Sequence, residues 1–328
     1  MCDFLIVQSK NRTKSTASFL RIRNRLNNNS EREKMKIKYL LIVFLLALLP
    51  AYTFPQDEET ESDTTGKEWD WHDWKEFNKD MDFMHGSPTV VLGYGFSALS
   101  LKQFSGEFSD PNLIELKLGY TNEKNYPSEE NILKYSFRYL YLSNISTDLS
   151  NNSTGLSNDT WRFGGGMASG YGYKIGKGAV IPYYSADLSW SKLNLKDQVL
   201  TAENEKFLSP FDNTFRFGTN WEGGIKFKVI PMLTFDASYE RAVIFPRHLF
   251  WKWLGSAAIE AAGGWAIDGF VKEIMHSSPY AGPIMSFILK NAMSYGIYEL
   301  RQEKMNWPFK SAAPLAYDQF KFGFTVNF

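Results

Sequence analysis

Hydrophobic and polar residues alternate with a period of two along most of the chain after Thr89. In the last nine residues, Phe320, Phe322, Phe324, Val326 and Phe328 alternate with Lys321, Gly323, Thr325 and Asn327. Successive side chains of a β-strand point to opposite faces, so this pattern predicts a strand with one apolar and one polar face. The same period recurs in seven segments upstream, at 90–97, 114–120, 133–141, 161–173, 180–190, 215–229 and 233–240. The sequence therefore predicts eight strands.

The two predicted faces differ in side-chain size. The apolar face is crowded with Phe, Tyr and Trp, whereas the other face is rich in Gly, Ser and Thr. A soluble barrel turns its apolar face inward, and a membrane barrel turns it toward lipid. Eight strands enclose space only for side chains, so a ring of large aromatics would overfill the interior. This favours an all-β transmembrane fold, an eight-stranded antiparallel up-and-down barrel.

Charged residues on the polar face give the same orientation. Each Arg or Lys at the lipid midplane of a barrel costs about 2–4 kcal/mol, and several together would exceed a net stability of about 5–15 kcal/mol. The interior is therefore expected to hold a network of paired charges: Glu115, Lys117, Lys134, Arg138, Arg162, Asp187, Arg216, Glu222, Lys226, Asp236, Glu240 and Lys321. In the segment 133–141 this orientation sends Tyr135, Phe137, Tyr139 and Tyr141 toward lipid.

The lengths of the predicted links alternate along the chain. Outer-membrane barrels have short periplasmic turns and longer external loops. Counted upward from Thr89, the links 101–112, 143–160, 192–213 and 246–316 fall on the external side, and 121–131, 174–179 and 230–231 fall on the internal side. Every long link is thus external, although 121–131 is longer than a tight turn requires. A soluble fold has no reason to sort its loops in this way.

An insert precedes the last strand. Residues 247–304 lose the period of two, and Leu249–Ile274 shows a small-residue stripe of Ser256, Ala257, Ala261 and Gly264 that is typical of close helix packing. Gly263 and Gly264 are a point where this helix would break. A second helix is expected from Ile284 to Lys304. The barrel domain, 88–328, is therefore expected to carry an external helical hairpin within 246–316.

Two placements of this hairpin are open, across the membrane or over the external mouth of the barrel. Lys252, Glu260, Asp268 and Lys272 are spread through the first helix, and each would be costly at the bilayer centre. The favoured placement is therefore a cap over the mouth, with Phe250, Trp251 and Trp253 entering the lipid interface. An apolar surface of this size would also suit an external protein or lipid ligand.

The N-terminal part carries a targeting signal. From Met35, two lysines precede an uncharged run of thirteen residues, the order seen in secretory signal peptides, so 35–55 is assigned as one. The run is shorter than the ~18–20 residues of a spanning helix. Signal peptides begin a chain, so 1–34 is interpreted as upstream sequence misread as coding; the alternative is a cytoplasmic extension before a signal anchor. Residues 56–87 form an acidic, aromatic-rich periplasmic segment, either an interfacial helix or a solvated tail.

Charge and cysteine content narrow the function classes. The formal net charge of the chain is zero, but residues 1–34 hold eight basic and three acidic side chains, and the chain beyond Gln56 holds 26 basic and 33 acidic ones. A nucleic-acid partner is not expected, because phosphate binding needs clustered positive charge. The single cysteine, Cys2, excludes a disulfide framework and a multi-cysteine zinc site. No cofactor or metal is expected.

The signal peptide, residues 88–245 and the final strand at 317–328 together resemble the small eight-stranded outer-membrane β-barrel proteins of Gram-negative bacteria. The terminal Phe328, after Phe322 and Phe324, resembles the signal that the outer-membrane assembly machinery reads. The helical insert departs from this pattern. The resemblance implies a chain exported to the cell outer membrane, with outer-membrane lipid and the assembly machinery as partners.

The leading functional hypothesis is a barrel of structural, adhesive or recognition type, with loops and hairpin as its interaction surface. A wide pore is not expected, since aqueous channels occur in barrels of about 16–18 strands. One alternative is an outer-membrane lipid-modifying esterase or acyltransferase with a Ser/His site at the outer rim, for which His248, His276 and Ser277 are the candidates, although no nucleophile-elbow motif is present. Another is a secreted soluble barrel that binds an apolar ligand.

Overall fold

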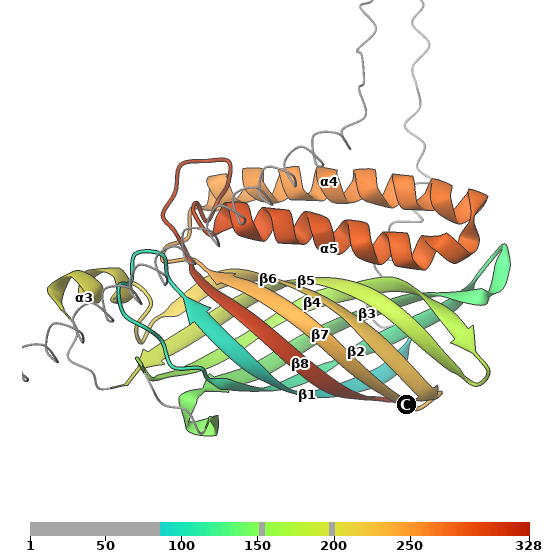
Figure 1. Ribbon diagram of the computed structural model, residues 1–328, viewed down its shortest axis with the longest axis horizontal. Helices are drawn as coiled ribbons and strands as arrows, with labels where there is room; N and C mark the ends of the chain where they lie inside the picture. Colours follow the sequence, from blue (N-terminus) through green and yellow to red (C-terminus); the bar gives the residue numbers. More distant parts are fainter. Residues whose placement is uncertain (1–85, 151–154, 197–200) are drawn as a thin grey trace, which may run out of the picture. The chain divides into compact units, whose positions relative to one another are not determined.

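The computed structural model describes residues 86–150, 155–196 and 201–328, and these form one closed antiparallel barrel with a helical hairpin beside it (Figure 1). Each strand pairs with the next in sequence, and β1 pairs with β8 to close the barrel. The predicted eight-stranded up-and-down topology is confirmed. The strands are β1 Ser87–Ser100, β2 Asn112–Tyr126, β3 Glu129–Ser146, β4 Asn158–Ile175, β5 Gly178–Leu195, β6 Phe215–Ile230, β7 Leu233–Ile244 and β8 Leu315–Asn327.

The links between strands are sorted by length to the two ends of the barrel. At one end, named the short-turn end, the links are 127–128, 176–177 and 231–232. At the other, the long-loop end, they are 101–111, 147–157, 196–214 and 245–314. The long internal link expected at 121–131 shrinks to a two-residue turn, because β2 and β3 extend to Tyr126 and Glu129.

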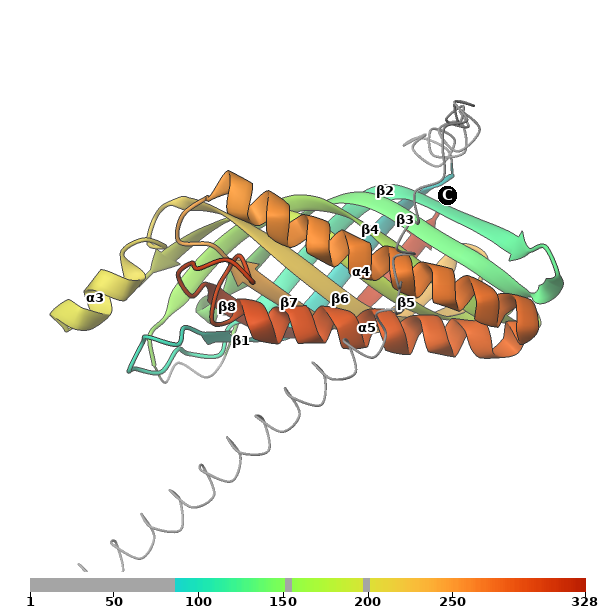
Figure 2. The ribbon, with the colours of Figure 1, turned by 90° about the horizontal axis from the view of Figure 1, so that it is seen from above.

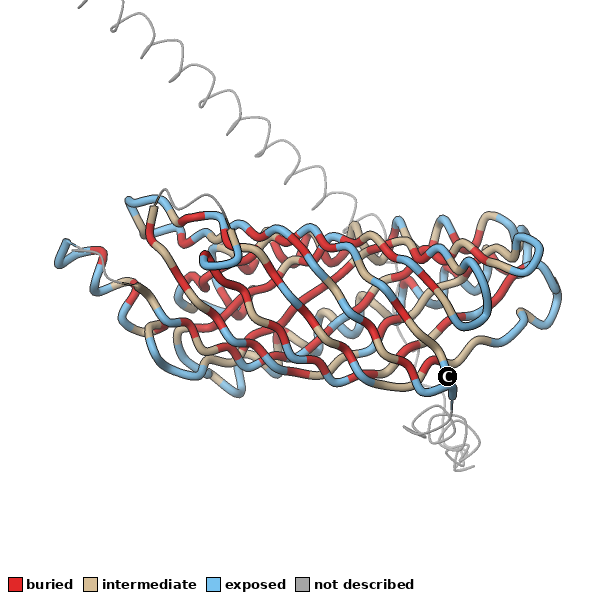
Figure 3. Tube along the Cα trace, turned by 90° about the horizontal axis from the view of Figure 1, so that it is seen from below, coloured by how far each residue is buried: buried red, intermediate tan, exposed pale blue. Residues whose placement is uncertain are grey.

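The barrel wall is apolar outside and polar inside. Along the strands, buried and exposed positions alternate (Figure 3). On β8, Phe320, Phe322 and Phe324 are exposed on the outer face while Lys321 is buried. On β5, Leu188 and Trp190 are exposed while Asp187 is buried. The wall thus turns its large apolar side chains outward, as predicted.

Strand β3 has the opposite orientation to the predicted one. Tyr135, Phe137, Tyr139 and Tyr141 are all buried inside the barrel. The other face of the strand points outward, with Leu140 exposed by 64%. Lys134 and Arg138 lie on the same outer face as Leu140, so the prediction that these two residues line the interior is wrong.

Glycines on β4 explain why the interior accepts the β3 rings. Tyr141 lies opposite Gly164, Tyr139 opposite Gly166 and Tyr135 opposite Gly170. A Cβ at position 164 would lie 2.9 Å from the Tyr141 ring, and one at position 166 would lie 1.8 Å from Asp187 Oδ1. The aromatic residues of one strand therefore occupy the volume that the neighbouring strand leaves free. The expectation that an eight-stranded barrel excludes large rings from its interior is therefore wrong for β3. It did not take into account the glycines on the strand that pairs with β3.

A hydrophobic cluster closes the interior at the long-loop end. Helix α3, Ala202–Leu208, and the turn after it supply Leu208 and Phe211, both almost fully buried. Strand ends and loops supply the rest: Leu101, Leu113, Ile145, Leu156, Leu193, Ala242, Ile244, Leu315 and Tyr317. The long loops thus fold back into the mouth and fill it with side chains.

The hairpin consists of α4, Phe250–Ser277, and α5, Gly282–Arg301, joined through the short helix η2, Pro279–Ala281. It lies along the outer wall, where α5 contacts β4, β5, β6 and β7 (Figures 1 and 2). The prediction that it caps the mouth is therefore wrong. Its tip reaches the short-turn end, where the Tyr173 hydroxyl donates to the Tyr280 carbonyl at 2.6 Å.

The helix boundaries follow the predicted ones closely, and α4 does not break at Gly263–Gly264. These glycines instead lie against Met293 of α5, with a Cβ at position 263 placed 3.0 Å from the Met293 sulfur. Small residues on α4 therefore allow the two helices to pack closely. Among the residues with described positions, no helix has the combined length and apolar composition needed to cross a membrane.

The assignments of 1–34 as misread sequence, of 35–55 as a signal peptide and of most of the acidic segment 56–87 lie outside the described residues. Of that segment, only Gly86 and Ser87 are described.

Candidate functional site

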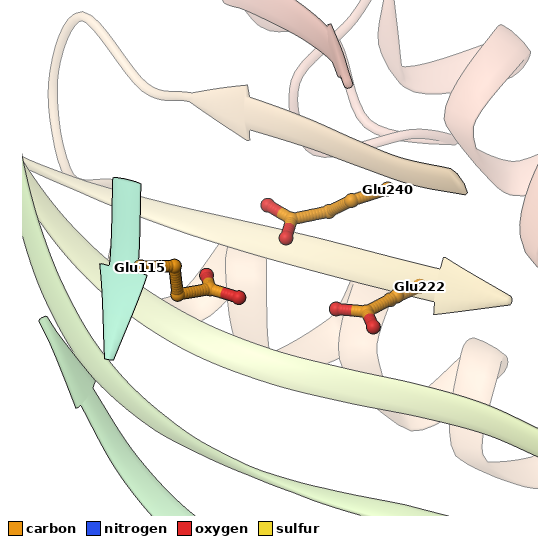
Figure 4. A group of neighbouring side chains, drawn as sticks. All are labelled: Glu115, Glu222 and Glu240. Atoms are coloured by element: carbon orange, nitrogen blue, oxygen red, sulfur yellow. The ribbon is translucent and has the colours of Figure 1, made fainter. Parts of the chain in front are cut away.

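Three carboxylates from three strands converge on one ammonium group in the middle of the barrel. Lys321 Nζ on β8 donates to Glu115 Oε1 at 2.9 Å, to Glu222 Oε2 at 2.6 Å and to Glu240 Oε2 at 2.5 Å. The three glutamates come from β2, β6 and β7 and point toward one another (Figure 4). All four side chains are at most 4% exposed.

Two further cations complete the neutralisation of these carboxylates. Lys117 Nζ lies 2.7 Å from Glu222 Oε2 and 3.4 Å from Glu115 Oε1. Arg162 Nη1 donates to Glu240 Oε1 at 2.5 Å, and its Nη2 donates to Gln319 Oε1 at 3.1 Å. Three buried acids therefore face three buried bases. This balance matters because a buried charge without a partner is strongly destabilising.

The three glutamates also have the composition of a metal site. One carboxylate oxygen from each lies within 4.8 Å of the others, and carboxylate oxygens are ligands for Ca²⁺ and Mg²⁺. Lys321 Nζ, however, lies within hydrogen-bonding distance of all three. Its ammonium group provides the positive charge that a bound cation would otherwise supply, so we assign no metal here.

The network extends from this cluster toward the short-turn end. The Tyr183 hydroxyl donates to Glu222 Oε1 at 2.5 Å, and Lys226 Nζ lies 3.5 Å from Asp236 Oδ1 and over the Tyr183 ring. The cavity between these groups has a volume of about 20 Å³, room for about one water molecule. A cavity of this size, lined by charged groups, has no room for an apolar ligand.

The structure brings together nine of the twelve predicted luminal residues in the interior. They are Glu115, Lys117, Arg162, Asp187, Glu222, Lys226, Asp236, Glu240 and Lys321. Arg216 has inner parity but lies half-buried at the rim, where its Nε donates to the Pro210 carbonyl. Lys134 and Arg138 lie on the outer face of β3.

Sequence reasoning missed the tyrosine and amide partners of these charges. The Tyr139 hydroxyl donates to Asp187 Oδ1 at 2.8 Å, and the Tyr141 hydroxyl accepts from Asn220 Nδ2 at 2.6 Å. The glycines that alternate on β4 were a usable signal, because such a face needs large side chains from a neighbouring strand.

The candidate catalytic residues do not converge. His248 precedes α4 and stacks edge-on against Phe217, whereas His276 lies near the other end of this 28-residue helix. The Ser277 hydroxyl donates to the carbonyls of its own helix at Glu273 and Ile274. A placement of both histidines at the outer rim is therefore wrong, since His276 lies near the short-turn end.

A second polar cluster lies between the hairpin and the barrel wall. Arg301 Nη2 on α5 lies 3.0 Å from Glu260 Oε2 on α4 and 3.0 Å from the Ser256 hydroxyl, and Arg301 Nη1 donates to Thr219 on β6 at 3.3 Å. The Trp221 indole on β6 donates to Glu260. This set, Thr219, Trp221, Ser256, Glu260 and Arg301, is called the seam cluster below. It joins both helices to one strand.

Beside the seam cluster, α5 covers a charged pair on the outer face of the wall. Arg241 on β7 lies opposite Asp318 on β8 in the strand register. The Tyr298 hydroxyl of α5 donates to Asp318 Oδ2 at 3.0 Å, and the guanidinium of Arg241 lies 4.6 Å from the Tyr295 ring centroid. The hairpin therefore shields polar groups that the barrel wall alone would expose.

The predicted assembly residues lie toward the C-terminal end of β8, on the short-turn side of the barrel. Phe322 and Phe324 are exposed on the outer face, and Phe328 is exposed at the end of the chain near the short-turn end.

Searches for similar proteins found neither a protein-family model nor a curated relative that matches this sequence. Among solved structures, Neisserial surface protein A shares 10% identity with this chain over 74% of it and 97% of that protein, with a TM-score of 0.33. Ail, the attachment invasion locus protein of Yersinia pestis, shares 10% over 75% and 100%, with a TM-score of 0.29. OprG, an outer membrane protein of Pseudomonas aeruginosa, shares 10% over 74% and 96%, with a TM-score of 0.24.

Proposed function

We propose that this chain is an integral outer-membrane barrel protein whose interior is closed, and that it acts through its external loops in a structural, adhesive or recognition role. The observation that carries the proposal is the orientation of the wall. Large apolar residues from all eight strands are exposed to the surroundings, and a network of charged residues is buried inside. The outward set includes Leu92, Leu118, Leu140, Phe163, Leu188, Phe227, Phe235 and Phe322.

The energetics of this wall support a lipid environment. Burying a Leu, Phe or similar side chain yields about 1.5–3 kcal/mol, so an apolar band around the whole barrel would be costly in water. Soluble monomers expose apolar patches of only a few hundred Å². In a membrane the same band meets acyl chains, and the paired strands leave no open sheet edge. The sorted loops support placing the long-loop end outside and the short-turn end in the periplasm.

The filled interior supports a role that does not depend on transport. The charge network occupies the middle of the barrel, and the hydrophobic cluster around Leu208 and Phe211 occupies the long-loop end. The surface of the long loops is then the part of the protein that is available on the external side. Such a surface suits attachment to, or recognition of, an external partner. The exposed aromatic end of β8, at Phe328, would serve insertion by the assembly machinery.

Membrane fractionation tests the proposal. We expect the protein to pellet with the outer membrane, to resist alkaline extraction and to require detergent for release. Because a closed barrel resists SDS until heated, unheated and boiled samples should migrate differently on a gel. A protein that stays in solution at high concentration without detergent contradicts the proposal.

A further inference from the structure

The surface of α4 that faces away from the barrel carries large apolar side chains along its whole length. On α4, Trp251 is 79% exposed and Trp265 is 75% exposed, with Leu254, Ile259 and Phe270 also exposed along the helix. A helix on a water-exposed surface carries polar residues on its outer side, whereas a helix that is apolar all round is buried in protein or in lipid. The outer face of α4 therefore needs a cover other than water.

From these observations we infer that the acyl chains of the membrane cover this face, so that the hairpin is a lipid-facing extension of the barrel wall. This inference rests on the proposed function. The hairpin lies on the outer wall of β4–β7, where lipid would otherwise contact the strands. Its apolar surface thus continues the apolar surface of the barrel, and one phase can cover both.

The distribution of charge along α4 fits the thickness of the apolar band. Between Lys252 and Asp268, Glu260 is the one charged residue, and the seam cluster neutralises it. The fifteen residues between those two charges span about 22 Å at the rise of an α-helix. The apolar band of an outer-membrane barrel is about 25 Å tall. Charged groups lie beyond this stretch at both ends, where headgroups or water begin.

The charged residues in and next to this apolar stretch also have partners of opposite charge. Arg301 is buried against Glu260, Ser256 and Thr219. Lys290 of α5 pairs with Asp268 of α4 at 2.7 Å. The hairpin therefore offers acyl chains an apolar stretch whose one charge, Glu260, pairs with Arg301, while Asp268 at the end of the stretch pairs with Lys290. The same arrangement argues against a water-soluble partner, which would find only one charge, the paired Glu260, between Lys252 and Asp268.

Site-directed spin labelling tests this inference on the full chain. Three exposed alanines, Ala258, Ala262 and Ala266, lie on the outward side of α4, and each is replaced singly by cysteine in a Cys2→Ser background. Labelled protein in phospholipid vesicles is probed for collisions with oxygen, which concentrates in acyl chains, and with a water-soluble nickel chelate. Leu140→Cys reports the barrel wall and Glu203→Cys on α3 reports the aqueous loops.

We expect the ratio of oxygen to nickel collision rates at all three α4 positions to be several-fold higher than at position 203 and close to that at position 140. If position 140 contacts lipid while the α4 positions contact water, the hairpin inference is wrong and the proposed function stands. If position 140 contacts water, both are wrong. Spin–spin broadening that disappears on dilution with unlabelled protein would show a second copy on this face, which also overturns the inference.

Discussion

Replacing Lys321 by methionine removes the ammonium group that three buried carboxylates share. Of their cationic partners, Glu115, Glu222 and Glu240 would keep Lys117 and Arg162. Breaking a buried ion pair by removing one partner costs about 3–5 kcal/mol, so we expect Lys321→Met to lower the free energy of unfolding by that amount. Urea titration in detergent micelles, followed by tryptophan fluorescence, measures it. Lys124→Met, at an exposed position of β2, is the control and should unfold with the parent chain.

Restoring the charge balance of the cluster tests whether unpaired charge is the cause of this loss of stability. Glu115→Gln removes one acid from the same cluster, at the carboxylate whose Oε2 has no hydrogen-bond partner. In the double variant, Lys321→Met with Glu115→Gln, two acids face two bases, so we expect a smaller loss than the sum of the two single losses. Additive losses would mean that the cluster stabilises the barrel by packing and not by charge.

Two adjacent glycines of β4 test how tightly the interior is packed beside this strand. Gly166→Ala would place a methyl group 1.8 Å from Asp187 Oδ1, whereas the nearest atom to a methyl at Gly165 is the end of the Leu140 side chain, at 3.0 Å. Overpacking of a filled core costs about 1–3 kcal/mol. We therefore expect Gly166→Ala to lower the urea midpoint clearly and Gly165→Ala to change it little. Equal effects of both would contradict the packing of the interior described here.

At the level of elements, Arg301 joins the hairpin to the barrel wall through Glu260, Ser256 and Thr219. Arg301→Met leaves the half-buried Glu260 without its cation, and of the seam cluster only the Trp221 indole then donates to that carboxylate. We expect the hairpin to loosen from β6, which faster proteolysis within 250–301 and a shift of the Trp221 emission would report. Because the charge imbalance is the cause, adding Glu260→Gln should restore much of the protection.

A surface pair on the same segment provides the matched comparison. Lys102 and Glu303 form an ion pair at 3.0 Å between two exposed side chains. Exposed pairs contribute about 0–1 kcal/mol, so Glu303→Gln should leave the proteolysis pattern unchanged. A hairpin equally sensitive to both changes would show that the seam cluster has no special role in holding it.

At the scale of the whole molecule, the filled interior predicts that the barrel does not conduct. Charged and aromatic side chains occupy its middle, and the cavity between these groups has a volume of about 20 Å³. Reconstituted into planar lipid bilayers, the protein should leave the membrane current at the level of the protein-free bilayer across the usual voltage range. Steady, reproducible single-channel steps would contradict the closed interior and with it the transport-independent role.

Much of the architecture was readable from local pattern. A period of two depends only on neighbouring residues, so the strands, their number and the inward direction of Lys321, Glu222 and Arg162 followed from alternation and from the cost of charge in lipid. The helix limits at Phe250, Ser277 and Gly282 were also close to prediction. Each of these features is set within one segment.

The remaining features depend on which segments become neighbours. β3 carries large residues on both faces, so only its pairing with the glycines of β4 determines that Tyr139 and Tyr141 point inward. The composition of the hairpin allows a place in lipid or at the mouth of the barrel. Contacts between distant segments, such as those of Glu260 with Arg301 and Trp221, place it on the wall. The sequence by itself determined the strands, the helices and the inward direction of most charged residues on the strands, because each of these features is set within one segment. The tertiary structure alone decided which groups share a volume or a counter-charge, because those energies exist only between segments far apart in the chain.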